Sequence, residues 1–346
     1  LPNSGNWSLA EMQSSLLTDF YGRPITMRAI VLLPESYGTS GEQTYPTLYW
    51  IGGFGSDHLG AFQFNNLWKQ MPGGDRVIRV VLDPLCFGGH HVFADSENNG
   101  PRAQALLSEF IPYLEKTYRV DSNPETRFLS GASSGGWSSL WLQLMHPDSF
   151  GGVWSLCPDP VDFRAFQQVD LYAPQANLFV AKDGQRAALA RAGGQNTIYT
   201  DNFVAVENVL GDGGQIRSFE WVFSPRGKDG QPLRIADPIT GVINPEVAEA
   251  WKKYDIQRYM RDNWNQIKPK LDNKITIIVG SEDTFYLDGA VVLLAETVEE
   301  LGADVRIEIL EGEDHGSFIN KQLFHRIDRE ILDRYNAQRP AGTTAE

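Results

Sequence analysis

The 346-residue sequence predicts an α/β fold in which a mostly parallel central sheet is flanked by helices and carries a large cap-like insertion. Short apolar strands alternate with helix-period segments over residues 1–163 and again over 274–336, and this alternation is typical of a parallel sheet. Between them, residues 164–273 lose that periodicity and contain many Gly and Pro turns. A structureless loop of this length is implausible inside a domain, so the sequence predicts an insertion with elements of its own. Residues 337–346 read as a tail.

The first informative segment is a glycine loop at the end of an early strand. Apolar strands are expected at residues 28–33 and 47–51, and the second runs into residues 52–55, which read G-G-F-G. Without side chains, glycine positions let backbone N–H groups approach a ligand closely. This loop can therefore supply one donor of an oxyanion hole, although a plain glycine turn would have the same sequence.

The next expected strand, at residues 76–82, opens into an irregular loop over 83–99 that holds Cys86, His90 and His91. Adjacent positions of an extended chain point apart, and no Asp, His or Cys partner lies at a metal-binding spacing. We therefore expect both histidines to form a wall or a surface, and we predict no metal site.

The strongest signal is the G-x-S-x-G motif formed by Gly131, Ser133 and Gly135. In this motif the serine sits on a sharp turn between a strand and a helix, and small neighbours let the chain bend that tightly. Residues 126–130 read as the strand, and apolar residues between 137 and 145 recur at helical spacing. This context favours a nucleophilic serine over the alternative, a simple Gly/Ser loop.

Two later strand ends supply the partners that such a serine needs. A serine hydroxyl is a poor nucleophile unless a base takes its proton and an acid holds that base. The strand expected at residues 274–279 leads to Asp283, and the strand at 305–310 leads to His315. The resulting order of serine, acid and histidine is the one expected of this architecture.

Other acids and histidines lie close by in the sequence. His325 also follows Asp283, but it falls inside the last expected helix, at residues 318–335, where it would be held on one helix face. Glu282 and Asp288 lie near enough to Asp283 to be confused with it. We therefore select His315 as the base and Asp283 as the acid.

The insertion leaves from the strand expected at 152–156 and returns just before the strand that leads to Asp283. Ligands of open parallel sheets bind beyond the carboxyl ends of the strands, so we expect the insertion to fold over Ser133. Its expected elements are a strand at 219–223 and a helix at 246–264. The candidate substrate contacts are Trp221, Trp251 and Trp264, with Phe223 and Tyr254 beside them. Any one of these aromatics could instead form the core of the cap.

Composition and charge exclude several classes of protein. The chain has 44 acidic and 30 basic residues, and its formal net charge of -14 would repel phosphate backbones, so no nucleic-acid partner is expected. No apolar run approaches the ~20 residues that would cross a membrane. The chain starts at Leu1 with neither a methionine nor a leader, which favours a secreted or periplasmic protein over a cytoplasmic one. The sequence does not indicate an oligomeric state.

Residues 106–163 contain the runs E-F-I-P-Y-L-E-K-T-Y-R-V, G-A-S-S-G-G and H-P-D-S-F-G-G-V-W-S-L, which resemble the esterase D and feruloyl esterase group of α/β-hydrolases. The resemblance covers residues 45–163 and 275–318. It implies an α/β-hydrolase fold with the nucleophile at Ser133, the acid at Asp283, the base at His315 and oxyanion N–H groups at Phe54 and Ser134. The group usually has S-M-G-G where this chain has S-S-G-G, and His-Gly where it has Gly52-Gly53. Because the long insertion is also atypical, the resemblance does not carry the substrate over.

The sequence thus predicts a serine hydrolase of small or medium carboxylic esters, such as a hydroxycinnamate or a sugar ester, with no metal or organic cofactor. An acyltransferase of the same group would differ only in whether an acceptor alcohol outcompetes water. A binding protein with a silent site is the third reading. In this architecture two strands separate those that lead to Cys86 and Cys157, and a disulfide needs Cα atoms within ~7 Å, so two free thiols are expected.

Overall fold

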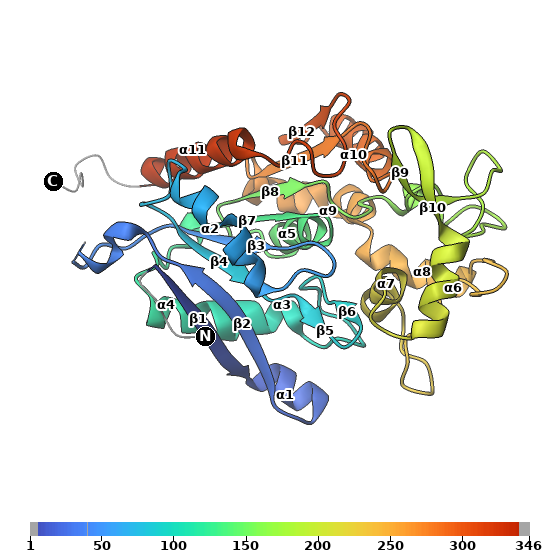
Figure 1. The fold of residues 1–346 in the computed structure, drawn as a ribbon, viewed down its shortest axis with the longest axis horizontal. Helices are drawn as coiled ribbons and strands as arrows, with labels where there is room; N and C mark the ends of the chain where they lie inside the picture. The colour runs from blue at the N-terminus through green and yellow to red at the C-terminus, as the bar shows by residue number, and fades with distance from the viewer. Residues whose placement is uncertain (1–5, 40, 339–346) are drawn as a thin grey trace.

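The computed structural model of the chain describes residues 6–39 and 41–338 and contains an eight-stranded sheet (Figure 1). Its strands are, in spatial order, β1 (Trp7–Ser14), β2 (Ile25–Leu32), β4 (Ile78–Leu82), β3 (Thr47–Ile51), β7 (Arg127–Ala132), β8 (Gly152–Leu156), β11 (Ile275–Gly280) and β12 (Val305–Leu310). The six strands from β4 to β12 run parallel, whereas β1 and β2 form antiparallel pairs at one edge. The predicted mostly parallel α/β sheet is therefore confirmed.

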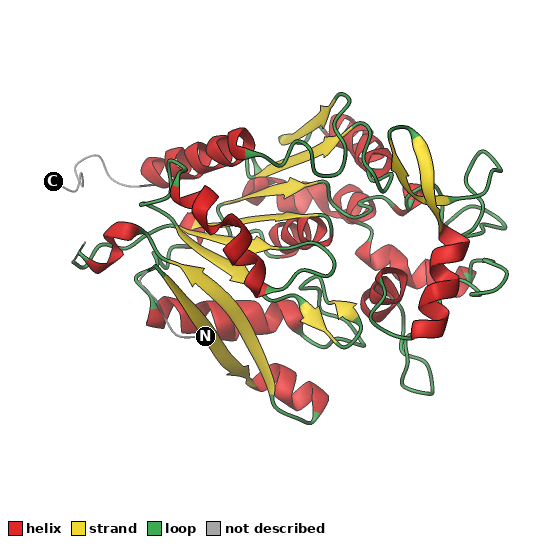
Figure 2. Cartoon of the chain, in the orientation of Figure 1, coloured by secondary structure: helices red, strands yellow, loops and turns green. Residues whose placement is uncertain are grey.

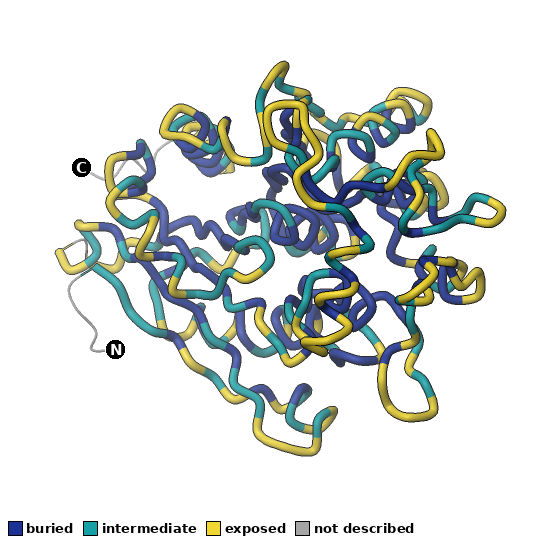
Figure 3. Tube along the Cα trace, turned by 45° about the vertical axis from the view of Figure 1, so that its right-hand side comes forward, coloured by how far each residue is buried: buried dark blue, intermediate teal, exposed yellow. Residues whose placement is uncertain are grey.

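The central strands are buried on both faces, as expected when helices cover a parallel sheet (Figure 2). On one face, α2 (Ala61–Lys69) and α11 (Lys321–Ala337) meet β3 through rings that pack within 6.2 Å of one another, namely Trp50, Phe64, Trp68 and Phe324. The helix α5 (Ser134–Met145) packs on β7, β8 and β3, and α10 (Asp288–Leu301) packs on β11 and β12. Figure 3 shows these buried stretches at the centre and exposed chain at the rim.

Two elements near the start of the chain were not expected from the sequence. They are the edge strand β1 and the helix α1 (Ser15–Tyr21). Ser14 caps this helix, because its hydroxyl accepts from the N–H of Leu17. β1 is only partly buried, so its pattern carried little signal. The other elements before β7 include the short strands β5 (Leu85–Cys86) and β6 (Gly89–His90) and the helices α3 (Arg102–Ala105) and α4 (Ile111–Thr117), with a π-helical segment at Leu106–Phe110 between these two helices.

The insertion lies beyond the ends toward which the parallel strands point, at the right of Figure 1. It contains β9 (Ala188–Ala192), β10 (Gln195–Tyr199), α6 (Thr200–Leu210), α7 (Gln215–Phe223) and α8 (Pro245–Trp251). The strand expected at residues 219–223 is wrong, because this segment is the second half of α7. Ile216, Phe219 and Phe223 are buried at the spacing of a helix, and the short apolar run alone could not distinguish the two structures.

The single helix expected at residues 246–264 is also wrong in detail. After α8, the chain turns at Lys252–Tyr254 and starts again as α9 (Ile256–Leu271), because the carboxylate of Asp255 caps the new helix by accepting from the N–H of Arg258. α9 packs against α5 and α10, although the expected boundary at residue 273 assigned it to the insertion. Of the expected tail, Ala337 ends α11, and residues 339–346 lie outside the described part.

Candidate active site

The strand-to-helix turn at Ser133 has the tight geometry that its motif predicts. Ser133 has φ 58° and ψ −124°, a conformation that is uncommon for a residue with a side chain. A Cβ on Gly131 would lie 2.4 Å from the carbonyl oxygen of Gly135, and one on Gly135 would lie 2.0 Å from that of Ile51. Both glycines are therefore required by close backbone packing, and they hold the start of α5 against the neighbouring strand.

The glycine loop after β3 lies directly beside this turn. A Cβ on Gly53 would come within 3.1 Å of the Cβ of Ser133. The two expected oxyanion donors, the N–H groups of Phe54 and Ser134, belong to the residues that directly follow this contact. The loop thus has the position that the proposed oxyanion hole requires, and the role of the two amides stays a prediction.

His90, which the sequence analysis expected in a wall or on a surface, binds the backbone of the glycine loop. The Nδ1 atom of His90 accepts from the N–H of Val92 at 3.0 Å, so the ring proton sits on Nε2 and is donated to the carbonyl oxygen of Gly52, also at 3.0 Å. Burial lowers the pKa of His90 to about 4, so the ring stays neutral. Both His90 and His91 are buried, so the surface alternative is wrong and the wall alternative holds.

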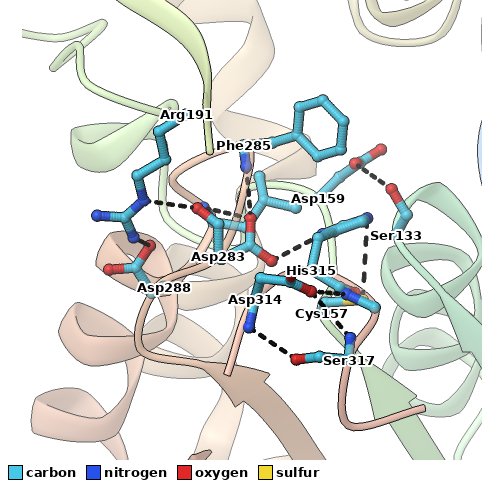
Figure 4. Close-up of polar contacts among 12 residues, drawn as sticks. Ser133, Cys157, Asp159, Arg191, Asp283, Phe285, Asp288, Asp314, His315 and Ser317 are labelled. Atoms are coloured by element: carbon cyan, nitrogen blue, oxygen red, sulfur yellow. Dashed lines mark hydrogen bonds and ion pairs between the residues drawn. The ribbon is translucent and has the colours of Figure 1, made fainter. Parts of the chain in front are cut away.

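The structure brings the expected acid and base together. His315, after β12, places Nδ1 2.7 Å from Oδ2 of Asp283, which follows β11 (Figure 4). The other carboxylate oxygen of Asp283 accepts from the N–H groups of Phe285 at 2.8 Å and Leu287 at 3.3 Å. The strand ends approach so closely that a Cβ on Gly280 would lie 2.1 Å from the carbonyl oxygen of Glu313. Burial is the largest single influence and disfavours the charged imidazole, but the contacts with Asp283 and Cys157 together outweigh it and raise the pKa of His315.

The alternative partners have other contacts. The Glu282 carboxylate is about half exposed and pairs with Arg191 at 3.4 Å, and Asp288 pairs with the same guanidinium at 3.0 Å. His325 lies inside α11, as the sequence predicted. Among the acids and histidines considered from the sequence, only Asp283 and His315 form a carboxylate–imidazole pair in the described structure.

Two residues after β8 complete this centre, and the sequence analysis assigned them no role. Cys157 has φ 34°, its Sγ lies 3.9 Å from Nε2 of His315, and its thiol donates to the carbonyl oxygen of His315 at 3.2 Å. Asp159 is 3% exposed and accepts from the hydroxyls of Ser134 at 2.5 Å and Ser133 at 3.5 Å. Figure 4 shows both side chains beside Ser133 and His315. The only available signal was their position at a strand end, because a short Cys-Pro-Asp-Pro run matches no motif.

The insertion contacts the loop that carries Asp283, here called the acid loop, through Arg191 of β9 (Figure 4). Its Nε donates to the carbonyl oxygen of Asp283 at 2.9 Å, and its Nη2 donates to that of Ser281 at 3.2 Å. The guanidinium also lies 4.6 Å from the ring centroid of Tyr286. The insertion therefore holds the loop that carries the acid, a role that the sequence analysis did not foresee.

The three tryptophans that were expected to contact substrate are buried. Trp251 is 0% exposed, packs on Phe223 and donates from Nε1 to Ser224, and Trp264 is 2% exposed in α9. These placements make Trp251 and Trp264 part of the core and give neither of them an accessible face. Trp221 is 9% exposed and packs edge-on against Phe87 of the loop after β4, so it holds the insertion against that loop.

Among the described residues, one group of three or more side chains has metal-ligating atoms close together, formed by Cys157, Asp283 and His315 within 4.8 Å of one another. The 2.7 Å hydrogen bond between Asp283 and His315 accounts for two of these three without a metal. Both cysteines are unbridged, as expected. Among the described residues, no helix has the length and apolar character needed to cross a membrane.

Fold and site together define an α/β-hydrolase with a centre of the serine-hydrolase type: a serine on a strained turn, and an acid–histidine pair at the ends of the last two strands. The family comparison agrees. The model of the "Putative esterase" family matches residues 23–318, and the chain belongs to this family. The predicted membership of the putative esterase family is therefore confirmed.

Similar proteins point the same way. An esterase of Mycobacterium tuberculosis (strain H37Rv) is 32% identical over 116 residues, which are 32% of this chain and 24% of that protein. The matched segment thus spans about a quarter of the length of this curated relative. A ferulic acid esterase structure has 13% identity, a TM-score of 0.59, and coverage of 96% of this chain and 100% of that one. An S-formylglutathione hydrolase from Agrobacterium tumefaciens has 14% identity, a TM-score of 0.56 and 97% coverage of both chains. At these identities the structures show a common fold alone.

Proposed function

We propose that this protein is a serine esterase that hydrolyses a small or medium carboxylic ester through an acyl-enzyme. The observation that carries the proposal is the 2.7 Å hydrogen bond between Asp283 and His315, formed at strand ends beside the strained turn of Ser133. Membership of an esterase family supports the same reaction class.

In the first half of the proposed reaction, the Oγ of Ser133 attacks the ester carbonyl carbon while Nε2 of His315 takes the hydroxyl proton. The carbonyl oxygen becomes an oxyanion and accepts from the N–H groups of Phe54 and Ser134. Asp283 holds Nδ1 of His315, which keeps Nε2 free to accept the proton, and stabilises the imidazolium that forms. When the carbon–oxygen bond to the alcohol breaks, His315 returns the proton to the leaving oxygen.

In the second half, water attacks the acyl-enzyme and gives one proton to His315. The second tetrahedral adduct then expels the Oγ of Ser133, which recovers that proton, and the carboxylic acid leaves. Hydroxycinnamate and sugar esters are the first substrates to test, since a ferulic acid esterase is among the structures with this fold.

The experiment combines active-site labelling with turnover. A fluorophosphonate probe should label the wild-type protein once, at Ser133, and Ser133→Ala should lose both labelling and at least about a thousandfold in kcat. Ser108→Ala is the control, because Ser108 is an exposed helical serine that donates to the carbonyl oxygen of Gln104. Hydrolysis that survives in folded Ser133→Ala would overturn the proposal. Added alcohols that divert the acyl group to transfer products would identify an acyltransferase.

A further inference from the structure

The carboxylate of Asp159 is a buried charge beside the nucleophile. It is 3% exposed, and its backbone N–H donates to the carbonyl oxygen of Ser133 at 3.2 Å, which fixes it next to the turn. One oxygen accepts from Ser134 at 2.5 Å, and the other accepts from the hydroxyl of Ser133 at 3.5 Å, near the upper limit for a hydrogen bond. No Lys, Arg or His in the described part of the chain forms an ion pair with it. An acid in this position is neither the triad acid nor a paired structural charge.

The reaction removes the weaker of these two contacts. When Ser133 attacks, its proton passes to His315, and its Oγ becomes an ester oxygen with nothing to donate. The Oδ1 atom of Asp159, which belongs to a residue only 3% exposed, then loses the donor that Ser133 supplied, and an unsatisfied buried acceptor is costly. Its negative charge would also oppose the oxyanion that forms beside Ser134. An ester without a hydrogen-bond donor must bear both costs.

A substrate can remove both costs by supplying the missing donor. We propose that Asp159 is a specificity-determining residue that selects esters whose acyl group carries a hydroxyl or ammonium group close to the carbonyl carbon. Such a group donates to Oδ1 in place of Ser133, and an ammonium also neutralises the carboxylate. The donor belongs on the acyl side because Ser133 stays esterified until water has attacked, and only the acyl part is present through both halves of the reaction. This inference rests on the proposed esterase function and names its substrate class.

The test compares matched acyl groups on one leaving alcohol. The substrates are the phenyl esters of propionate, 2-hydroxypropionate, 2-aminopropionate and 2-methoxypropionate. The methoxy ester matches the hydroxy ester in electron withdrawal and carries no donor, so their kcat/KM ratio isolates the hydrogen bond. We expect the wild type to prefer the hydroxy ester over the methoxy ester by about tenfold or more, since a hydrogen bond to a charged group is worth at least that factor.

Asp159→Asn keeps the size of the side chain and removes the charge. It should lower the hydroxy-to-methoxy and amino-to-propionate ratios of kcat/KM several-fold, and these ratios are compared independently of any change in the rate with propionate. Asp162→Asn is the matched control in the same loop, because Asp162 is a buried carboxylate that pairs with Arg164 at 2.6 Å and does not contact Ser133. Loss of all four activities in equal measure would show that Asp159 only positions Ser133 and would overturn the selectivity.

A measurement on the wild type covers the case in which the variant does not fold. Burial raises the pKa of Asp159 to about 6, while the hydroxyl of Ser134 and the charge of His315 oppose that rise. The hydroxy-to-methoxy ratio should therefore fall as the pH drops below about 6. Protonation of His315 slows both esters alike and cancels in the ratio, as does any effect of Asp283. A ratio near one at every pH, with all esters hydrolysed, would refute the selectivity and leave the esterase proposal intact; no hydrolysis of any ester would refute the esterase proposal itself.

Discussion

Replacing Arg191 by methionine tests whether the insertion is part of the catalytic apparatus. The guanidinium donates to the carbonyl oxygens of Asp283 at 2.9 Å and Ser281 at 3.2 Å, and its side chain is only 17% exposed. At about 1.5 kcal/mol for each bond from a charged donor, the two carbonyl contacts hold the acid loop by about 3 kcal/mol. The ion pair between Arg191 and Glu282 adds little to this free energy, because the Glu282 carboxylate is 53% exposed.

If the loss of these two hydrogen bonds misplaces Asp283 in the transition state, Arg191→Met should lower kcat by ten- to a hundredfold, since about 1.4 kcal/mol corresponds to a factor of ten. Loss should appear in kcat rather than KM, because Arg191 acts through the acid loop. Arg191→Lys keeps the charge but lacks the forked guanidinium that reaches both carbonyl oxygens. Its kcat should therefore lie between that of the wild type and that of Arg191→Met.

The assay is steady-state turnover of an aryl ester, with thermal unfolding measured in parallel. Arg186→Met is the control, because Arg186 lies in the same insertion but pairs with Asp201 at 2.7 Å and stacks 4.1 Å from the ring centroid of Tyr199. A folded Arg191→Met protein whose kcat stays within about twofold of the wild type would refute the reasoning. Equal losses in both variants would assign the effect to the insertion as a whole.

Two further predictions concern the base and the insertion core. Neutral His315 is the form that accepts the serine proton, so kcat/KM should rise with pH through its ionisation. The rise should lie above the ordinary histidine pKa of ~6.5, because Asp283 and Cys157 together outweigh burial and raise the pKa of His315. His315→Gln should abolish turnover and His325→Gln should preserve it; a pH limb below ~6, or loss only at His325, would contradict the assignment. Trp251→Ala should lower the free energy of unfolding by about 3–5 kcal/mol, because the Trp251 side chain is 0% exposed. A folded variant with altered ester selectivity would instead show that Trp251 contacts substrate.

The sequence alone determined the parts of this protein that depend on neighbouring residues. The turn at Ser133 needs small residues two positions away on either side, so Gly131 and Gly135 made it readable without a structure. Asp283 and His315 each follow a short apolar strand, and parallel strands bring their carboxyl ends to one edge of a sheet. The order of these residues therefore carried both the fold class and the expected triad.

Tertiary structure decided what depends on contacts between distant segments. The segment at 219–223 has an apolar run that suits a strand or a helix, and the burial of Phe219 and Phe223 against the aromatic core selects the helix. The tryptophans looked suitable for a pocket by composition, but burial placed Trp251 and Trp264 in the core.

The same holds for the polar surroundings of the site. Arg191 and Asp283 are 92 residues apart, and His90 meets Gly52 across 38 residues, so neither pair has a spacing that a sequence pattern could reveal. Asp159 is meaningful only because its carboxylate is buried beside Ser133, 26 residues away, with no cationic partner among the described residues. Local backbone requirements leave a signature in sequence, whereas burial and charge pairing are properties of the folded chain, and these properties set the environment of the nucleophile.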